Sequence, residues 1–479
     1  MKKLIITIAA VLSFGLVSTS AAEKEQKPEP KNHFKLYGFV RNYFVFDSRE
    51  SVSGTGDLFY YLPKDVKFVD GIDIHNTPSL SCLALTSRLG VDVSGYSIGN
   101  VHFGAKIEGD FYAGLSNSTN ANAGAYFPGN TKISGTAQAR LRQAYATVTW
   151  KDLPFSEKAK ASVALKMGQA WHPMAADFPH LFSLEVGAPF GPFSRTPLVQ
   201  MDATLGNNWV VSGAAIWQMQ YQSNGPIGNS ASYMKYGMTP EVYAAVAYKT
   251  KGFLVRAGVD LLSIKPRVLG TVDLETSEAA DNQQPITKTV RVSDRKTSIL
   301  YYIYAQYSKG KFGVKAKSTY GQGGEHMNLM SGYAKVGECQ DGSWIYESLR
   351  NTSSWVSFSY GKKWQAVLFL GYIKNLGLAE KVNAPYLSKS DVYFCSNGFT
   401  NLNQMYRVNP QVIYNIGKLN VGLEYQWTHV QYGDYLNGKY EIAGKFYEIK
   451  DGLNKRGLAT ENLHWVGNHR VNLMVKYNF

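Results

Sequence analysis

The connections between the expected strands constrain the fold more than any single motif. The 479-residue chain contains sixteen segments in which apolar and polar side chains alternate, as they do in a β-strand whose two faces meet different surroundings. Short connections such as "SIGN", "KTKG", "SKGK" and "NIGK" follow even-numbered segments, whereas long polar connections such as 265–295, 321–351 and 432–466 follow odd-numbered segments. A β-sandwich has no reason to sort its connections by length, but a membrane-spanning barrel has short turns on one side and long loops on the other.

We therefore expect an all-β fold, a transmembrane antiparallel β-barrel of about sixteen strands. Most segments have about the 9–11 residues that a tilted strand needs to cross a bilayer. Neither helical periodicity nor a linker interrupts them, so one large unit is expected instead of two or three soluble domains. The expected strands are 34–47, 83–95, 100–112, 138–150, 160–171, 195–205, 208–221, 239–250, 253–264, 296–309, 311–320, 352–361, 364–375, 405–416, 419–431 and 467–479.

The two ends of the chain support this interpretation. Residues 1–22 have the charged, apolar and small-residue regions of a secretory signal peptide, and 23–33 is expected to be a short periplasmic arm before a barrel at 34–479. The last segment alternates up to its final residue, Phe479. Because a barrel leaves no open strand edge in lipid, this strand should pair with the first.

Aromatic residues are common at both ends of the expected strands, as in the two interfacial girdles of outer-membrane barrels. Those at the short-turn ends are Trp150, Trp209, Tyr248, Tyr307, Tyr360, Trp364 and Tyr414. Those at or near the loop ends are Phe44, Phe46, Trp171, Tyr221, Tyr320, Tyr372 and Trp427. Only this distribution at both ends carries weight, because a single aromatic residue is more often a packing residue.

Several short segments resemble the sixteen-stranded trimeric porins of Gram-negative outer membranes, most closely Bacteroidota-type porins and the DcaP-like group. The likeness rests on "KLYGFVRNYF", "KIEGDFYAG", "LRQAYATVTW", "LKMGQAW" and the last strand. It covers nearly all of the chain after the leader. The arm 23–33 is too short for the N-terminal coiled coil of some DcaP-like members. The resemblance implies a homotrimer in which the second loop, 113–137, reaches a neighbour. It also implies that Phe479 belongs to the C-terminal signal that the barrel-assembly machinery recognises.

The third long connection, "HPMAADFPHLFSLEVGAPFGPFSRTP", is unusually rich in Phe, Leu and Pro. Exposure of so many apolar side chains to water is unfavourable. We expect this third loop to fold into the lumen and form a constriction, as the resemblance also implies. The alternative is a loop that contacts a neighbouring subunit or acts as a lid.

Strand parity predicts which charged residues face the lumen. The basic candidates are Arg41, Arg88, Lys106, Arg140, Arg142, Lys166 and Arg470. Asp92, Glu108 and Asp110 share this wall and partly neutralise it, while Asp177 and Glu185 are the carboxylates available on the third loop. The fourth strand is ambiguous because Gln143 lies on the parity opposite to its arginines. We expect a basic stripe that faces the third loop and gives weak anion selectivity.

Three classes of function remain possible for such a barrel. The first is an outer-membrane porin for passive diffusion of small hydrophilic solutes and ions. The second is a substrate-specific channel for anionic solutes or small saccharides, with Tyr37, Phe39 and Tyr43 as an aromatic track. The third is an adhesin or structural barrel with a plugged lumen. The expected partners are outer-membrane lipid and lipopolysaccharide, the barrel-assembly machinery, small solutes and further copies of the chain.

Enzymatic and nucleic-acid functions have little support in the sequence. Common hydrolase, metalloprotease and P-loop motifs are absent, and we expect no catalytic residue, cofactor or metal ion. Although the formal charge is +14, lysines are spread along the chain, so no nucleic-acid partner is expected. A disulfide between Cys339 and Cys395 is possible in an exported protein, which would leave Cys82 unpaired.

Overall fold

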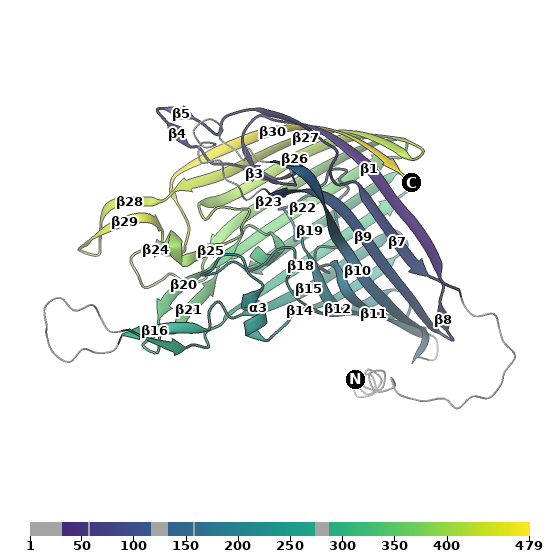
Figure 1. Ribbon diagram of the computed structural model, residues 1–479, viewed down its shortest axis with the longest axis horizontal. Coiled ribbons are helices and arrows are strands. Elements are labelled where there is room, and N and C mark those ends of the chain that lie inside the picture. The colour runs from purple at the N-terminus through teal and green to yellow at the C-terminus, as the bar shows by residue number, and fades with distance from the viewer. Residues whose placement is uncertain (1–30, 56–57, 116–132, 157–158, 274–286) are drawn as a thin grey trace.

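The computed structural model describes residues 31–55, 58–115, 133–156, 159–273 and 287–479. Its main sheet is a closed antiparallel barrel in which every strand pairs with its sequence neighbours and β1 also pairs with β30 (Figure 1). The sheet contains 18 strand segments, but β6, β7 and β8 are consecutive pieces of one wall strand, so sixteen strands cross the wall. The expected number of sixteen strands is confirmed.

The barrel segments are β1 (His33–Asp47), β6 (Ser79–Leu83), β7 (Arg88–Ser94), β8 (Ser97–Ile98), β9 (Val101–Leu115), β10 (Ile133–Ser156), β11 (Ala159–Trp171), β12 (Arg195–Leu205), β13 (Trp209–Ile216), β14 (Glu241–Thr250), β15 (Phe253–Ile264), β18 (Lys296–Lys309), β19 (Phe312–Gln322), β22 (Arg350–Gly361), β23 (Trp364–Gly377), β26 (Leu402–Ile416), β27 (Leu419–Asp434) and β30 (Glu461–Asn478).

The long connections carry the remaining elements. These are β2 (Ser51–Gly54), β3 (Phe59–Pro63), β4 (Phe68–Val69), β5 (Ile72–Asp73), α3 (Ser232–Gly237), β16 (Leu269–Asp273), β17 (Thr287–Arg291), η1 (Glu325–Met327), β20 (Gly332–Glu338), β21 (Trp344–Ser348), β24 (Leu387–Ser388), η2 (Lys389–Asp391), β25 (Val392–Phe394), β28 (Leu436–Ile442) and β29 (Lys445–Leu453). Most of them lie at one end of the barrel in Figure 1, opposite the short turns. No helix of the described residues is long and apolar enough to cross a membrane.

The last strand shows how the barrel is oriented between its two environments. Val471 and Leu473 are exposed on the outside, whereas Arg470 and Asn472 are buried inside. This distribution is the inverse of a water-soluble sandwich, whose apolar face is buried. It therefore supports an outer surface that contacts lipid and an interior that contains the polar groups.

The seam between the two ends of the chain is tightly closed. β1 pairs with β30 from Phe39 opposite Asn478 to Asp47 opposite Arg470, and the Phe479 N–H donates to the Gly38 carbonyl at 3.1 Å. A Cβ atom at Gly38 would lie 2.6 Å from the Phe479 ring. Glycine at this position therefore makes room for the terminal aromatic ring.

The second wall strand differs from the expected segment 83–95. It begins at Ser79 and is interrupted between Leu83 and Arg88. Tyr43 pairs with Leu83 and Phe39 with Arg88, so this strand uses one more residue than β1 over the same stretch. That difference is a β-bulge, which breaks the ladder and bends the strand.

The main hydrophobic core lies inside the barrel. It includes Phe190 and Phe193 of the third loop, Tyr61 and Leu62 of β3, and Phe369 of the wall. Trp171 and Tyr221 pack against this core, so they belong to the interior and not to the outer girdle as expected. The chain turns inward at the end of β11, which explains the position of Trp171.

Several expectations are corrected or fall outside the described residues. The three cysteines are free thiols, so Cys339 and Cys395 are not joined. The expected signal peptide 1–22, residues 23–30 of the arm 23–33, and most of the second loop 113–137 lie outside the described residues.

Candidate channel constriction

The third loop, 172–194, lies inside the barrel and is held by hydrogen bonds to the opposite wall. Lys317 of β19 donates to the Met174 carbonyl at 2.6 Å, and Arg407 of β26 donates to the Ala188 carbonyl at 3.1 Å. Ser357 of β22 accepts from the His180 backbone N–H at 2.8 Å. The expectation that this loop enters the lumen is confirmed.

A second connection, the first loop between β1 and β6, also enters the lumen and was not anticipated. All residues of β3 are buried. Phe59 contacts Phe193 of the third loop with ring centroids 5.0 Å apart, and the hydroxyl groups of Tyr61 and Tyr221 are 2.8 Å apart. The run "LFYYLP" at 58–63 is as apolar as the third loop, and this signal could have revealed the insertion.

Between these loops and the wall lies a cavity of about 290 Å³, which we call the basic cavity. Among the described residues, its lining contains six cationic side chains and no carboxylate. The cations are Arg41, Arg88, Arg140, Arg142, Arg195 and Lys476. Aromatic rings from Phe39, Tyr61, Trp171, Phe178, Phe182 and Phe193 lie among them.

Carboxylates on the same wall pair with three of the arginines. Arg142 donates to Glu108 at 2.9 Å and to Asp110 at 2.7 Å, and Arg140 binds Asp110 through two bonds of 2.9 and 3.0 Å. Arg88 is 3.6 Å from Glu108. Such paired contacts fix the planar guanidinium groups. The structure thus brings together six of the eleven expected residues.

The ambiguity of the fourth strand is explained by a β-bulge in β10. Leu141 pairs with Gly109 and Gln143 with Glu108, so Arg142 is an extra residue on this strand. Because a bulge shifts parity by one, Arg140 and Arg142 line the basic cavity while Gln143 lines a second cavity of about 440 Å³. A single parity cannot describe a bulged strand.

The other expected residues lie elsewhere. Lys166 and Asp177 line the second cavity, where Asp177 pairs with Arg256. Lys106 binds Asp92 at 2.8 Å and Tyr37 at 3.0 Å. Neither Lys106 nor Asp92 lines one of these two cavities.

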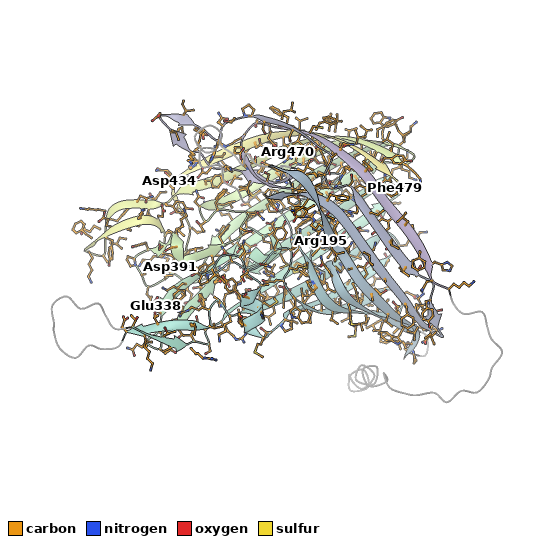
Figure 2. The ribbon with its side chains drawn as sticks, viewed as in Figure 1. Arg195, Glu338, Asp391, Asp434, Arg470 and Phe479 are labelled. Carbon is orange, nitrogen blue, oxygen red and sulfur yellow. The ribbon has the colours of Figure 1, made fainter. Side chains whose placement is uncertain are left out.

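Glu185 is buried and accepts a hydrogen bond from Gln426. Arg470, marked in Figure 2, lies under the first loop, where it donates to the Leu58 carbonyl at 3.4 Å and its guanidinium carbon is 5.0 Å from the Tyr60 ring centre. The expected carboxylates of the third loop therefore do not line the basic cavity.

Two cations of the basic cavity are not among the residues expected from strand parity. Arg195, also marked in Figure 2, is bonded to Gln220 and lies 5.0 Å from the Trp171 ring centre. Lys476 lies 5.5 Å from the Phe39 ring centre and 4.9 Å from that of Phe182. It shares parity with Arg470 on the last strand and could have been found by the same rule.

Among the described residues, three cations of the basic cavity form no ion pair with a carboxylate. Arg41 donates to the Thr86 hydroxyl at 3.0 Å, Arg195 bonds to a neutral amide, and Lys476 contacts aromatic rings. Nearby, burial and then the Lys315 ammonium lower the pKa of His180 to about 4, so this imidazole is neutral at pH 7. The cavity carries positive charge that is available to a solute.

No protein-family model and no curated protein sequence matches this chain. Among solved structures, the outer membrane channel DcaP of Acinetobacter baumannii is similar with a TM-score of 0.54 and 17% identity, covering 96% of this chain and 100% of that chain. The anion-selective porin from Comamonas acidovorans has a TM-score of 0.48 and 10% identity, covering 94% and 100%. Outer-membrane expressed OmpT of Vibrio cholerae has a TM-score of 0.47 and 12% identity, covering 95% and 100%. At such low identity the likeness to DcaP shows a shared fold, and this chain has the fold of an outer-membrane channel.

Proposed function

We propose that this protein is an outer-membrane porin, a passive channel for small hydrophilic solutes and ions with a preference for anions. The basic cavity carries the proposal, because its lining has six cations and, among the described residues, no carboxylate. Basic side chains around a narrow aqueous path raise the local anion concentration and disfavour cations. A channel needs no catalytic group, and no enzymatic activity is part of the proposal.

The exposure pattern supports the membrane location. Apolar side chains such as Val242 and Val246 point outward from β14, while Tyr243 and Ala245 point inward. The proposal includes the DcaP-like assignment suggested by the short motifs, contact with outer-membrane lipid and lipopolysaccharide, and a homotrimer. It also includes assembly by the machinery that recognises a C-terminal aromatic residue, here Phe479.

A substrate-specific channel for anionic solutes is the second candidate. The observation that favours it is the placement of Phe39 beside three cations, Arg41 at 4.9 Å, Arg88 at 5.0 Å and Lys476 at 5.5 Å from the ring centre. A flat anionic solute could meet both a ring and a cation there. Saturation of anion flux with solute concentration would favour this candidate, whereas a linear increase would favour simple diffusion.

The test is the reversal potential of the reconstituted protein across a salt gradient. We expect weak anion selectivity, and we expect it to decrease in the Arg41→Ala, Arg88→Ala double variant. At about 0.1 M salt, screening acts over about 10 Å, so the preference should also fade in concentrated salt.

The matched control removes two exposed lysines at the short-turn end of the barrel, Lys251→Ala and Lys309→Ala, and therefore changes net charge equally. It should keep the parent selectivity. Clear cation selectivity of the parent, or an equal loss in both double variants, would contradict the assignment of selectivity to the basic cavity. Both variants must first show the heat-dependent gel mobility of the folded parent barrel.

A further inference from the structure

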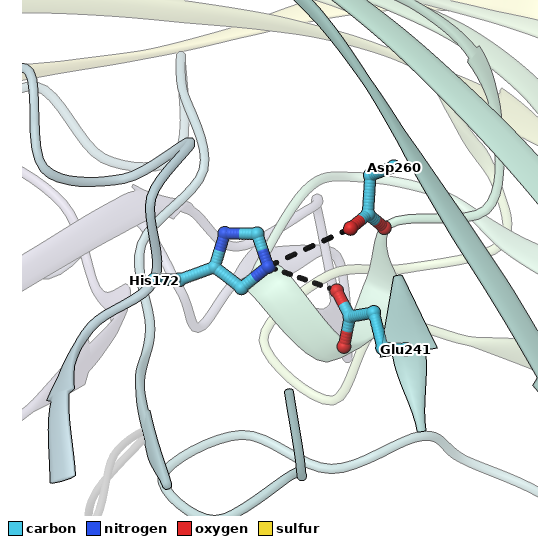
Figure 3. Close-up of side chains that lie close together, drawn as sticks. All are labelled: His172, Glu241 and Asp260. Carbon is cyan, nitrogen blue, oxygen red and sulfur yellow. Dashed lines mark hydrogen bonds and ion pairs between the residues drawn. The ribbon is translucent and has the colours of Figure 1, made fainter. Parts of the chain in front are cut away.

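Four side chains from four separate segments meet inside the barrel, away from the basic cavity. His172 begins the third loop, Glu241 begins β14, Asp260 lies in β15, and His326 lies in η1. The Nε2 atoms of His172 and His326 each lie 2.9 Å from Oε1 of Glu241. Nε2 of His172 is also 3.7 Å from Oδ1 of Asp260. Figure 3 shows the His172 ring pointing at both carboxylates.

Burial makes this cluster unusual. His172, Glu241, Asp260 and His326 have relative exposures of 0, 0, 2 and 3%. Oε2 of Glu241, Oδ1 of Asp260 and Nδ1 of His326 are buried and have no hydrogen-bond partner. Buried polar atoms are normally paired, so each unpaired atom needs an explanation.

We propose that His172, Glu241 and Asp260 bind one divalent transition-metal ion, with Zn²⁺ as the expected occupant. One imidazole and two carboxylates with an open fourth position form a donor set that suits Zn²⁺, whereas Ca²⁺ and Mg²⁺ select oxygen donors. Bonds of about 2.0–2.2 Å in a tetrahedron place donors about 3.3–3.6 Å apart. One ligand atom of each of the three residues lies within 4.8 Å of the others, and His326 contacts the Glu241 carboxylate as an outer residue at 2.9 Å.

Metal binding requires a proton to move on His172. The Met174 backbone N–H donates to Nδ1 of His172 at 3.1 Å, so in the metal-free arrangement Nε2 carries the proton and donates to Glu241. An ion on Nε2 takes the place of that proton, and the neutral ring then carries its proton on Nδ1. The Met174 N–H must turn away from it. Loading therefore rearranges the first turn of the third loop.

The site joins parts of the barrel that are far apart in the sequence. One ion would tie the first residue of the third loop to β14 and β15. A bound ion stabilises the folded state because the assembled ligands exist only there. The site does not depend on the proposed channel function, since its evidence is the ligand geometry.

The first experiment uses untagged wild-type protein in detergent. After chelation with 1,10-phenanthroline and dialysis, it should take up one Zn²⁺ per chain, measured by mass spectrometry of the metal, and its unfolding temperature should rise. Co²⁺ in place of Zn²⁺ should give visible absorption bands of a four-coordinate site. Neither result depends on a variant that could fail to fold.

The variant that tests the location is His172→Gln, and its matched control is His180→Gln, a third-loop histidine outside the cluster. We expect His172→Gln to weaken Zn²⁺ binding by at least about 10- to 100-fold, because even outer residues of metal sites cost that much. His180→Gln should bind like the wild type. Absence of both Zn²⁺ retention and Co²⁺ bands in the wild type would overturn the proposal and show that protons alone neutralise the buried carboxylates. Equal binding by His172→Gln would also overturn it.

Discussion

The two sides of the lumen wall use the same kinds of cation in different ways. On the wall covered by the third loop, β19 to β27, Lys317 and Arg407 donate to loop carbonyls and are almost fully buried. On the open wall, β1 to β10, Arg142 and Arg140 pair with carboxylates of the same wall and border the basic cavity. All four side chains point into the lumen.

This difference indicates that the covering loop determines the role of a cation that points into the lumen. A buried lysine that satisfies a carbonyl contributes to stability and cannot meet a solute. An arginine that pairs with a carboxylate of the wall still exposes part of its guanidinium to the cavity, as the 27% exposure of the Arg140 side chain indicates. We therefore expect substitutions on the open wall to change selectivity and substitutions on the covered wall to change loop stability.

The largest effect should come from Arg142→Met on the open wall. It removes a buried cation that binds both Glu108 and Asp110, and breaking a buried ion pair costs about 3–5 kcal/mol. Thermal unfolding in detergent should shift down, and the reversal potential should move toward cation preference. Arg142→Lys keeps the charge and should retain more of the selectivity than Arg142→Met. An unchanged reversal potential in Arg142→Met would contradict the expectation that cations of the open wall set the selectivity.

A smaller effect is expected from Lys317→Met on the covered wall. The change leaves the buried Met174 carbonyl without its donor, which costs about 1–3 kcal/mol. Single-channel current should become noisier because the third loop is held less firmly, while the reversal potential should stay the same. The exposed turn residue Lys311 provides a control, Lys311→Met, with no change in either property. A selectivity change as large as that of Arg142→Met would remove the distinction between the walls.

The smallest effect should come from Lys106→Met. Lys106 and Asp92 are 2.8 Å apart, but their side chains are 23 and 40% exposed. Such pairs contribute about 0–1 kcal/mol. A double-mutant cycle with Asp92→Asn should give a coupling energy in this range that falls with added salt. Because Lys106 does not line the basic cavity, the reversal potential should change less than in the Arg41→Ala, Arg88→Ala variant.

Sequence patterns predicted the barrel because alternation and turn length are local properties. The last strand, 467–479, and the third loop were recognisable from hydropathy alone, and both expectations hold. The first loop carried a similar apolar signal at 58–63 that was overlooked.

Other features depend on information that alternation does not contain. The bulge at Arg142 changes parity without any distinctive residue, so the directions of Gln143 and its neighbours could not be settled. Arg195 is the first residue of β12, and it lines the basic cavity although its parity is opposite to that of the inward residues Gln200 and Asp202. His172, Glu241, Asp260 and His326 have no motif spacing, because only the closed barrel brings them together.

The interruption of the second wall strand has a mechanical consequence. A closed ring of strands resists changes in cross-section because every rung of its ladder ties one strand to the next. Opposite Arg41 one rung is replaced by side-chain bonds, from the Arg41 N–H to the Ser87 hydroxyl at 3.2 Å and from the Arg41 guanidinium to the Thr86 hydroxyl at 3.0 Å. Shear of the wall meets less resistance at this point than along an unbroken ladder. The cation that borders the basic cavity therefore sits on a compliant part of the ring, and small deformations of the barrel change the width of the cavity there.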